Sequence, residues 1–211
     1  MRTIIFATTN ADKVKEIGEI MQGTDTQILQ MKDIGFDEDI DETGTTFTEN
    51  AAIKAKAVAD YIADKKKDFM DAIVMADDSG LEIDALGKMP GVQSHRWLGD
   101  RTYTQAMQDI IDEIKDVPEE KRTARFVCSI AAALPGKEDA ITVLETVEGM
   151  VAHELAGENG FGYDPFFYVP EFGCTTAQMT SEQKNQISHR GKAVRAMRDK
   201  LVGLKMIELS K

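Results

Sequence analysis

The order of hydrophobic patterns along the 211-residue chain most limits the folds open to it. An apolar, β-prone run at residues 3–7 precedes a helical pattern at residues 11–21, in which Val14 and Ile17 share one face. A second β-like run follows at residues 26–31. Strand, helix and strand in this order predict an α/β fold, with helices packed against a sheet.

The second half of the chain predicts a change of strand direction. Residues 126–134 and 140–148 are β-prone and are separated by Pro135-Gly136, which is typical of a long antiparallel hairpin. We therefore expect a long central mixed β-sheet flanked by helices. The length and the 42% hydrophobic content suit a single domain over residues 1–211, with two lobes.

Helix starts are marked by capping boxes, in which a Thr side chain and an acidic or amide side chain three residues later bind each other's backbone N–H groups. Residues 46–49 (Thr-Phe-Thr-Glu) fit such a box before an alanine-rich helix, and residues 180–183 (Thr-Ser-Glu-Gln) fit another. We expect the helix that follows the second box to be interrupted near Gly191. Another amphipathic helix is predicted at residues 103–114.

A short apolar run at residues 72–75 predicts a buried strand. We expect its end to deliver Asp77-Asp78-Ser79-Gly80 into a loop that continues to about Gly99, and strand ends are common places for active groups. By composition alone this tetrapeptide is more often a turn. If the strand instead runs through both aspartates, their side chains point to opposite faces, so one faces a site and the other a structural hydrogen-bond network.

Charge excludes two kinds of partner. The net charge of −12 argues against nucleic acid and against an anionic membrane, because both require basic patches. A small anion remains possible, since salt screens distant charge beyond ~10 Å. Cys128 and Cys174 lie in no CxxC pair and are expected to be reduced thiols. No apolar signal region follows Met1-Arg2, so we expect a cytoplasmic protein.

Two polar segments late in the chain suit a planar, polyanionic ligand such as a nucleotide. Phe161 stands between glycines in Gly160-Phe161-Gly162-Tyr163-Asp164-Pro165, so its ring can stack on a base. Lys184, His189 and Arg190 can donate to phosphate or to a base carbonyl. Ser188 and His189 diverge in direction, which argues against a nucleophilic pair.

The loop at residues 8–13 (Thr-Thr-Asn-Ala-Asp-Lys) joins the first predicted strand to the first predicted helix. Free N–H groups and the positive end of a helix dipole favour phosphate at such a place, and Lys13 adds a charge. Thr, Asn and Asp are also ordinary helix caps, and on the residues alone capping is favoured.

An acidic cluster lies at residues 37–42. For residues 37–39 we expect a solvated charge run, as in most such clusters. Glu42 begins the tripeptide Glu42-Thr43-Gly44 and is not counted with this charge run. Glu49 suits either a metal site or the capping box, and the cap is favoured.

These blocks, taken in order from residue 3 to about residue 200, resemble the non-canonical purine nucleoside triphosphate pyrophosphatases, the inosine triphosphatase-like or HAM1/RdgB family. The resemblance implies a nucleotide-binding cleft between the two lobes. It implies hydrolysis of ITP, dITP and XTP to the monophosphate and pyrophosphate, which cleanses the nucleotide pool. It also implies Mg²⁺ as cofactor and a homodimer.

The resemblance also assigns roles to residues. Asp78 is expected to be the catalytic base, and Asp78 and Glu42 are expected to hold the metal. The residues expected to bind substrate are Thr8, Thr9, Asn10, Ala11, Asp12, Lys13, Ser79, Phe161, Gly162, Tyr163, Asp164, Lys184, His189 and Arg190. Two departures from the family pattern stand out, namely His95 before Arg96, and Gln178 where glutamate is common.

Two other functions stay open at this point. The chain could be a nucleotide-binding regulator that keeps the pocket without turnover, or a phosphohydrolase of broader nucleotide scope. Intact Asp78 and Glu42 favour an enzyme over a regulator.

Overall fold

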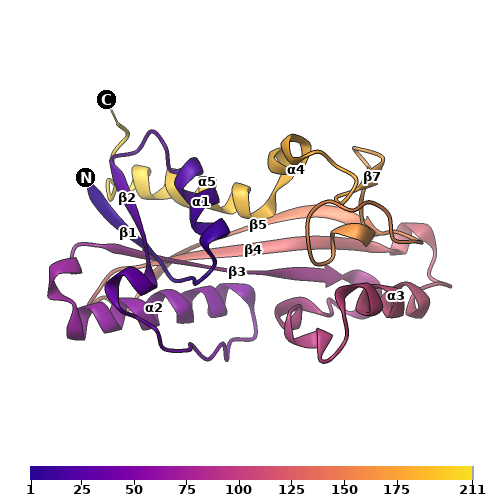
Figure 1. The fold of residues 1–211 in the computed structure, drawn as a ribbon, viewed down its shortest axis with the longest axis horizontal. Coiled ribbons are helices and arrows are strands. Elements are labelled where there is room, and N and C mark those ends of the chain that lie inside the picture. Colours follow the sequence, from indigo (N-terminus) through magenta and orange to yellow (C-terminus); the bar gives the residue numbers. More distant parts are fainter. Residues whose placement is uncertain (211) are drawn as a thin grey trace. The chain divides into compact units, whose positions relative to one another are not determined.

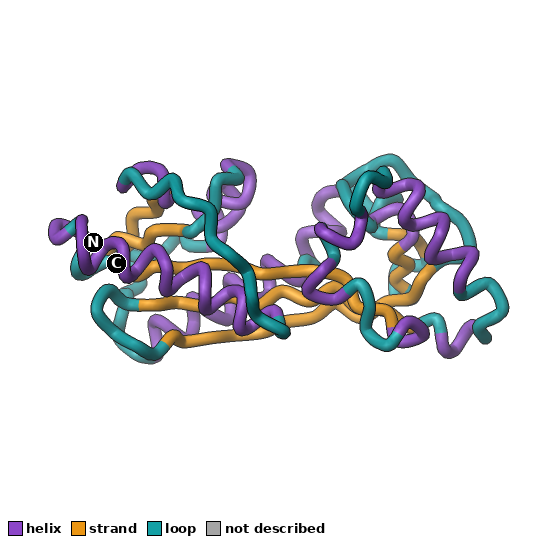
Figure 2. The backbone as a smooth tube through the Cα atoms, turned by 90° about the horizontal axis from the view of Figure 1, so that it is seen from below, coloured by secondary structure: helices purple, strands orange, loops and turns teal. Residues whose placement is uncertain are grey.

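The structure, a computed structural model, describes residues 1–210, and the side chains of all of these except residues 11 and 12. Figure 1 labels most of the helices and strands, and Figure 2 colours helices purple and strands orange. The α-helices are α1 (Ala11–Ile20), α2 (Phe47–Lys65), α3 (Tyr103–Glu113), α4 (Ser181–Ile187) and α5 (His189–Gly203). The strands are β1 (Arg2–Phe6), β2 (Thr26–Gln30), β3 (Ile73–Ile83), β4 (Thr123–Ala133), β5 (Ala140–Val151), β6 (Phe167–Val169) and β7 (Cys174–Thr175).

All of these strands belong to one seven-stranded sheet, in the order β2-β1-β3-β4-β5-β6-β7. β1 runs parallel to both of its neighbours, with Ile4 opposite Ile28 of β2 and Ile73 of β3. β6 runs antiparallel to β5 and to β7. The expected mixed α/β sheet is therefore confirmed.

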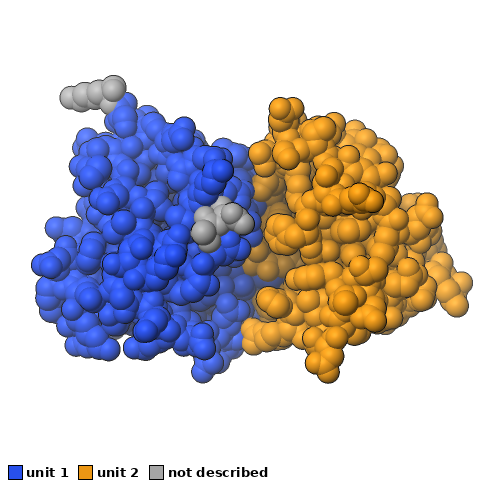
Figure 3. All heavy atoms as spheres, viewed as in Figure 1, with its two compact units in different colours: residues 1–78, 128–145, 190–211 blue, residues 79–127, 146–189 orange. Residues whose placement is uncertain are grey.

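The chain divides into two compact units, coloured separately in Figure 3. Unit 1 contains residues 1–78, 128–145 and 190–211, and unit 2 contains residues 79–127 and 146–189. One boundary falls inside β3, directly after Asp78. A nucleotide-binding cleft between two lobes stays a prediction.

Unit 1 is built in three layers, because alternate residues of its strands face different helices. Figure 1 shows α2 on one face of the sheet and α1 and α5 on the other. Val74 and Ala76 of β3 pack in one cluster with buried residues of α2 such as Ala55, whereas Ile73 and Met75 pack with Ile17 of α1 and residues of α5. These strands are apolar on both sides, as expected where helices cover both faces.

Unit 2 has its own core. Met107, Ile110 and Ile111 of α3 pack in one cluster with Leu81 and with Phe167 of β6. A cation, Arg122, is also completely buried in this unit. Its guanidinium donates to three backbone carbonyls, those of Val151, Ile114 and Ala152, at 2.8–3.0 Å. Burial lowers the pKa of Arg122. These bonds tie the end of α3 to the end of β5.

The expected end of the third strand near residue 75 is wrong, because β3 continues through both aspartates to Ile83. Aspartate is a poor strand former, but here each carboxylate meets cationic side chains, and these contacts outweigh local propensity. Beyond β3, the expected loop contains short 3₁₀ helices at Asp84–Leu86, Gly91–Gln93 and Arg96–Leu98.

Both predicted capping boxes are present. Thr46 and Glu49 bind each other's backbone N–H groups at the start of α2, and Thr180 and Gln183 do the same at the start of α4. The expected interruption near Gly191 lies earlier, at Ser188, whose ψ of 119° is not helical. Gly191 itself lies inside α5 and is buried.

Two further observations concern the cysteines and membrane-spanning helices. Both cysteines are free thiols, and Cys128 is buried. In the part of the chain that the structure describes, no helix combines the length and apolar character needed to cross a membrane.

Candidate active site

Asp77 and Asp78 occupy adjacent positions in β3 and therefore face opposite sides of the sheet. Asp77 points to the side of α1 and α5, where it meets Lys13 and Arg190. Asp78 points to the side of α2, where it meets Lys54. The two carboxylates thus belong to separate clusters within unit 1, as strand alternation predicts.

Asp77 is a buried anion held by two cations. Its side chain is 3% exposed, and both oxygens accept from Nζ of Lys13, at 3.0 and 2.9 Å. Nε of Arg190 donates to Oδ2 at 3.3 Å. Burial alone would raise the pKa of Asp77, but the charges of Lys13 and Arg190 lower it to about 2. Asp77 is therefore ionised at every physiological pH and fixes Lys13 and Arg190 in place.

Asp78 has a different environment. Nζ of Lys54 donates to Glu42 Oε1 at 2.7 Å and lies 3.3 Å from Asp78 Oδ1, so one ammonium joins two carboxylates. Asp78 Oδ2 is buried and finds no hydrogen-bond partner among the described residues. Burial raises the pKa of Asp78, and the nearby Glu42 adds to this, while Lys54 opposes it. A carboxylate with an unused oxygen and a raised pKa is suited to accept a proton.

Asp78 and Glu42 also fit the donor set of a divalent ion. Magnesium in phosphate-processing sites is usually held by one or two carboxylates, with substrate phosphates and water completing the octahedron. The unpartnered Oδ2 of Asp78 and the neighbouring Glu42 meet that requirement. Among the side chains that the structure describes, no group of three from His, Cys, Asp or Glu is placed to hold a metal. An ion here would depend on the phosphates for its remaining ligands.

The loop between β1 and α1 carries helix-capping contacts. Asn10 Oδ1 accepts from the backbone N–H of Lys13, and the Thr8 hydroxyl accepts from the N–H of Asn10, both at 3.2 Å. Thr9 is exposed. The side chains of Ala11 and Asp12 lie outside the described residues. The capping interpretation is thus realised, while phosphate binding by this loop stays a prediction.

In unit 2, Phe161 offers an open ring face. The residue is 73% exposed, and Nζ of Lys184 lies 5.4 Å from the ring centroid. Asp164, which is buried, accepts from the N–H of Phe161 at 2.8 Å, from Lys184, and from the hydroxyl of Thr176 at 2.8 Å. A Cβ on Gly160 would lie 2.2 Å from Asp164 Oδ2, so this tight loop requires glycine there. Asp164 thereby sets the position of Phe161 and Lys184.

The other predicted substrate residues of unit 2 have varied surroundings. Tyr163 is buried and donates its hydroxyl to the carbonyl of Ser94 at 2.8 Å, so its side chain acts in packing. The imidazole of His189 stacks on Phe126 at 5.1 Å. Ser79 is half-buried in β3. Gly162 has a φ of 65°, which glycine adopts without strain.

Arg190 belongs to unit 1, with a side chain that is 13% exposed. Beyond Asp77 it contacts Glu16 Oε2 through Nη1, at 3.3 Å. The described contacts thus link this guanidinium to structural carboxylates, and its predicted role in reading the base stays a prediction.

Sequence reasoning does not single out two residues of α2 that surround Asp78, namely Lys54 and Asn50. They lie four residues apart, so they share one face of the helix. Both interrupt an alanine-rich helix beside its buried stripe, and Asn50 is 0% exposed. A polar side chain at a core position of an amphipathic helix is the signal that could have identified them.

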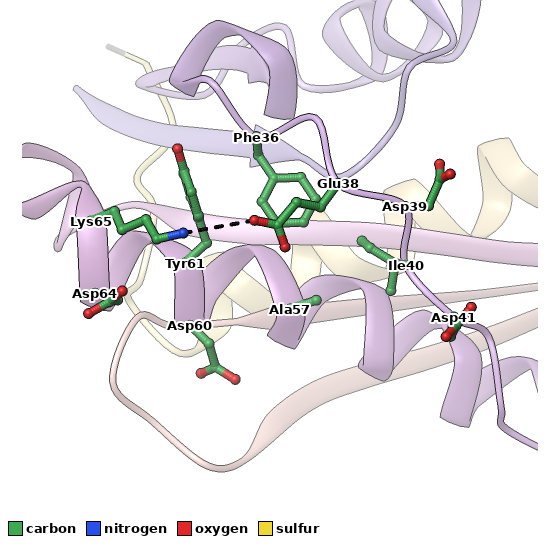
Figure 4. Close-up of a pocket in the computed structure, with 10 residues that line it drawn as sticks. All are labelled: Phe36, Glu38, Asp39, Ile40, Asp41, Ala57, Asp60, Tyr61, Asp64 and Lys65. Carbon is green, nitrogen blue, oxygen red and sulfur yellow. Dashed lines mark ion pairs between the residues drawn. The ribbon is translucent and has the colours of Figure 1, made fainter.

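A groove of about 440 Å³ lies elsewhere in unit 1, between residues 36–41 and α2. Figure 4 shows the residues that line it. Phe36 and Tyr61 form part of its wall, and Lys65 pairs with Glu38 at 3.8 Å. Residues 37–39 are exposed, in agreement with the predicted solvated charge run. None of the predicted site residues whose side chains the structure describes lines this groove.

Known proteins with similar sequences cover nearly the whole chain. The dITP/XTP pyrophosphatase of Bacillus subtilis (strain 168) is 45% identical over 198 residues, which is 93% of this chain and 96% of that protein. The dITP/XTP pyrophosphatase of Clostridium perfringens is 42% identical over 97% of this chain and 99% of that protein.

Solved structures agree with the sequence comparison. A HAM1 protein from Coxiella burnetii superimposes with a TM-score of 0.85 at 34% identity, covering 96% of this chain and all of that one. The Staphylococcus aureus Ham1 protein gives a TM-score of 0.83 at 36% identity, again covering 96% of this chain and all of that one. A sequence model of the Ham1 family matches residues 4–200, and the chain therefore belongs to the Ham1 family.

Proposed function

We propose that this protein hydrolyses non-canonical purine nucleoside triphosphates, with dITP, ITP and XTP as substrates, to the nucleoside monophosphate and pyrophosphate. The observation that carries the proposal is the environment of Asp78, a largely buried carboxylate with one oxygen free among the described residues and Glu42 close by. The names of the two bacterial relatives, both dITP/XTP pyrophosphatases, support the substrate class.

In the proposed reaction, Asp78 acts as general base. It orients a water molecule for attack on the α-phosphorus and accepts the proton that the water loses. The new bond forms between the water oxygen and phosphorus, the α–β anhydride bond breaks, and pyrophosphate leaves. Lys54 contacts Asp78 and Glu42 and holds both carboxylates in place while the phosphates bind.

Asp78 and Glu42 are also the proposed ligands of Mg²⁺. When bound, this ion would neutralise charge on the phosphate oxygens as it builds up in the transition state. Lys13 and the loop of residues 8–13 would hold the phosphate chain. Phe161 would stack on the purine, with Lys184 and His189 as donors to its 6-oxo group and Asp164 as an acceptor. We further propose a cytoplasmic homodimer that acts on free nucleotides.

The test is a product analysis across ITP, XTP, GTP and ATP with Mg²⁺. Cleavage between the α and β phosphates should release pyrophosphate and the monophosphate, and phosphorus NMR identifies both. Contaminating pyrophosphatase must be absent, which is checked by adding pyrophosphate to the enzyme alone. A diphosphate with orthophosphate would instead indicate a phosphohydrolase of broader scope. Binding without turnover would indicate a regulator.

Selectivity should follow the 6-oxo group of the base. Lys184 and a protonated His189 can only donate hydrogen bonds, whereas adenine presents an amino group at this position. Each donor facing a donor costs ~1–3 kcal/mol, so ATP should be rejected by a few orders of magnitude in kcat/KM. Guanine keeps the 6-oxo group, so discrimination against GTP should be weaker. Comparable kcat/KM values for ATP and ITP would contradict this account of the base site.

A further inference from the structure

Asn50 lies in the first turn of α2 and is completely buried. Its Oδ1 accepts a hydrogen bond from the backbone N–H of Gly44 at 2.8 Å. A Cβ on Gly44 would lie 2.6 Å from this oxygen and 2.7 Å from Cβ of Glu49, so only glycine allows the loop to come so close. The carbonyl end of Asn50 therefore holds the loop that carries Glu42.

The other end of the Asn50 amide faces the catalytic carboxylate. Asn50 lies one helical turn before Lys54, whose Nζ lies 3.3 Å from Asp78 Oδ1, so both side chains of α2 face the side of β3 to which Asp78 points. Asn50 Nδ2 is buried and has no hydrogen-bond partner among the described side chains and backbone, and the same holds for Asp78 Oδ2. A buried donor on α2 and a buried acceptor on the facing side of β3, both without a partner, gain free energy from a small movement that brings them together.

Asn50 and Lys54 are suited to different oxygens of the Asp78 carboxylate. Lys54 lies one helical turn further along α2 and contacts Asp78 Oδ1, while it also binds Glu42. Lys54 therefore contacts both predicted metal ligands, and Asn50, on the same face of α2, contacts the loop that carries one of them. Oδ2 has two lone pairs, so a hydrogen bond from Asn50 leaves the other free to face a cation or water.

We propose that Asn50 is a positioning residue that fixes Asp78 through Nδ2 and, through Oδ1, holds the Glu42–Gly44 loop at a set distance from it. The inference rests on the proposed function, because it gives Asp78 the central role in the reaction. Asn50 does not touch the nucleotide; it acts through the geometry of its neighbours.

The first test uses Asn50→Asp, which keeps an acceptor for Gly44 but replaces the donor facing Asp78 by a second carboxylate. On ITP with Mg²⁺, kcat should fall about 100-fold, as is usual when a reacting group shifts by about 1 Å, while KM changes by less than about 3-fold. The matched control is Thr48→Val. It removes the contact with Ser129 Oγ, 3.1 Å away, from the same turn of α2, and it should keep the wild-type kcat.

The second test measures stability alone, in EDTA and without nucleotide, by urea unfolding of a double-mutant cycle. Asn50→Asp should lower the midpoint strongly, since two carboxylates then face each other. In the Asp78→Asn background the same change should cost clearly less, because an acceptor at position 50 now faces an amide donor. A coupling of this sign is a direct signature of the contact between residues 50 and 78.

The outcomes of these tests distinguish a failure of the proposed function from a failure of the positioning role of Asn50. If wild-type protein hydrolyses none of the triphosphates, the proposed function fails, but the stability cycle still reports on the contact. A kcat for Asn50→Asp within a few-fold of wild type, or additive stability effects, would overturn the positioning role. If Asn50→Asp does not fold, folding of the double variant supports the contact. Failure of both variants to fold would show that a carboxylate at position 50 is not tolerated whatever residue 78 is, and it would overturn the proposal.

Discussion

Asp78→Asn is expected to abolish turnover while the fold remains intact. The amide keeps the shape of the side chain but can neither take a proton nor contribute charge to a metal site. The loss in the chemical step should be at least ~3 kcal/mol, or about two orders of magnitude in kcat. Steady-state kinetics on ITP, together with calorimetric titration of a non-hydrolysable analogue, would show lost turnover with much of the affinity kept.

The same variant carries a stability prediction of opposite sign. A carboxyl group whose pKa is raised by burial destabilises the folded state at neutral pH, where it is ionised. Asp78→Asn should therefore unfold at the same urea concentration as wild type or a higher one, provided that EDTA is present. Near-wild-type kcat in this well-folded variant would remove Asp78 from the catalytic role.

Asp77→Asn should show the reverse pattern to Asp78→Asn. We expect its main effect to be a loss of folding stability. The change removes the carboxylate that neutralises Lys13 and the largely buried Arg190. Leaving such cations without their anion should cost about 2–4 kcal/mol of unfolding free energy at pH 7, measured by urea unfolding. Glu16→Gln is the matched control, because it alters an Arg190 partner that is 32% exposed and should cost at most about 1 kcal/mol.

The cost of Asp77→Asn should also depend on pH. The pKa of Asp77 is lowered from 3.8 to about 2, so the folded state holds fewer protons than the unfolded chain between these values. The stabilisation is complete above pH 3.8 and is lost as the pH falls towards 2. The gap between wild type and variant should therefore narrow in this window. If the difference in unfolding free energy between wild type and Asp77→Asn stayed constant down to pH 2, the ion pairs of Asp77 would not be the source of that difference.

Features that depend on nearby residues could be predicted from the sequence. Thr46 and Thr180 each precede a Glu or Gln by three residues, and both form the expected capping boxes, because a cap needs only one turn of helix. Gln178 also makes a local contact. Its Oε1 accepts from the backbone N–H of Thr175 at 2.9 Å, which stabilises the turn after β7.

Features that depend on distant partners could not be predicted in the same way. Asp77-Asp78-Ser79-Gly80 has the composition of a turn, and only Lys13, Lys54 and Arg190, which come from three different helices, make a continuous strand tolerable there. The roles of Lys54 and Asn50 could not be predicted from the sequence for the same reason. Their partners lie at residue 78 and in the loop before α2, and no local pattern connects these segments.

Because side chains of β3 alternate between the two faces of the sheet, the strand should tolerate a change in its number of residues less well than a change in residue type. Side chains along a strand repeat every two residues, so deleting or inserting one residue before Asp77 would turn every following side chain to the other face. Asp77 would then be delivered towards α2 and Asp78 towards Lys13, while apolar residues of the strand changed layers. Insertion or deletion of one residue within residues 73–76 should thus damage folding and activity far more than a conservative substitution at the same positions.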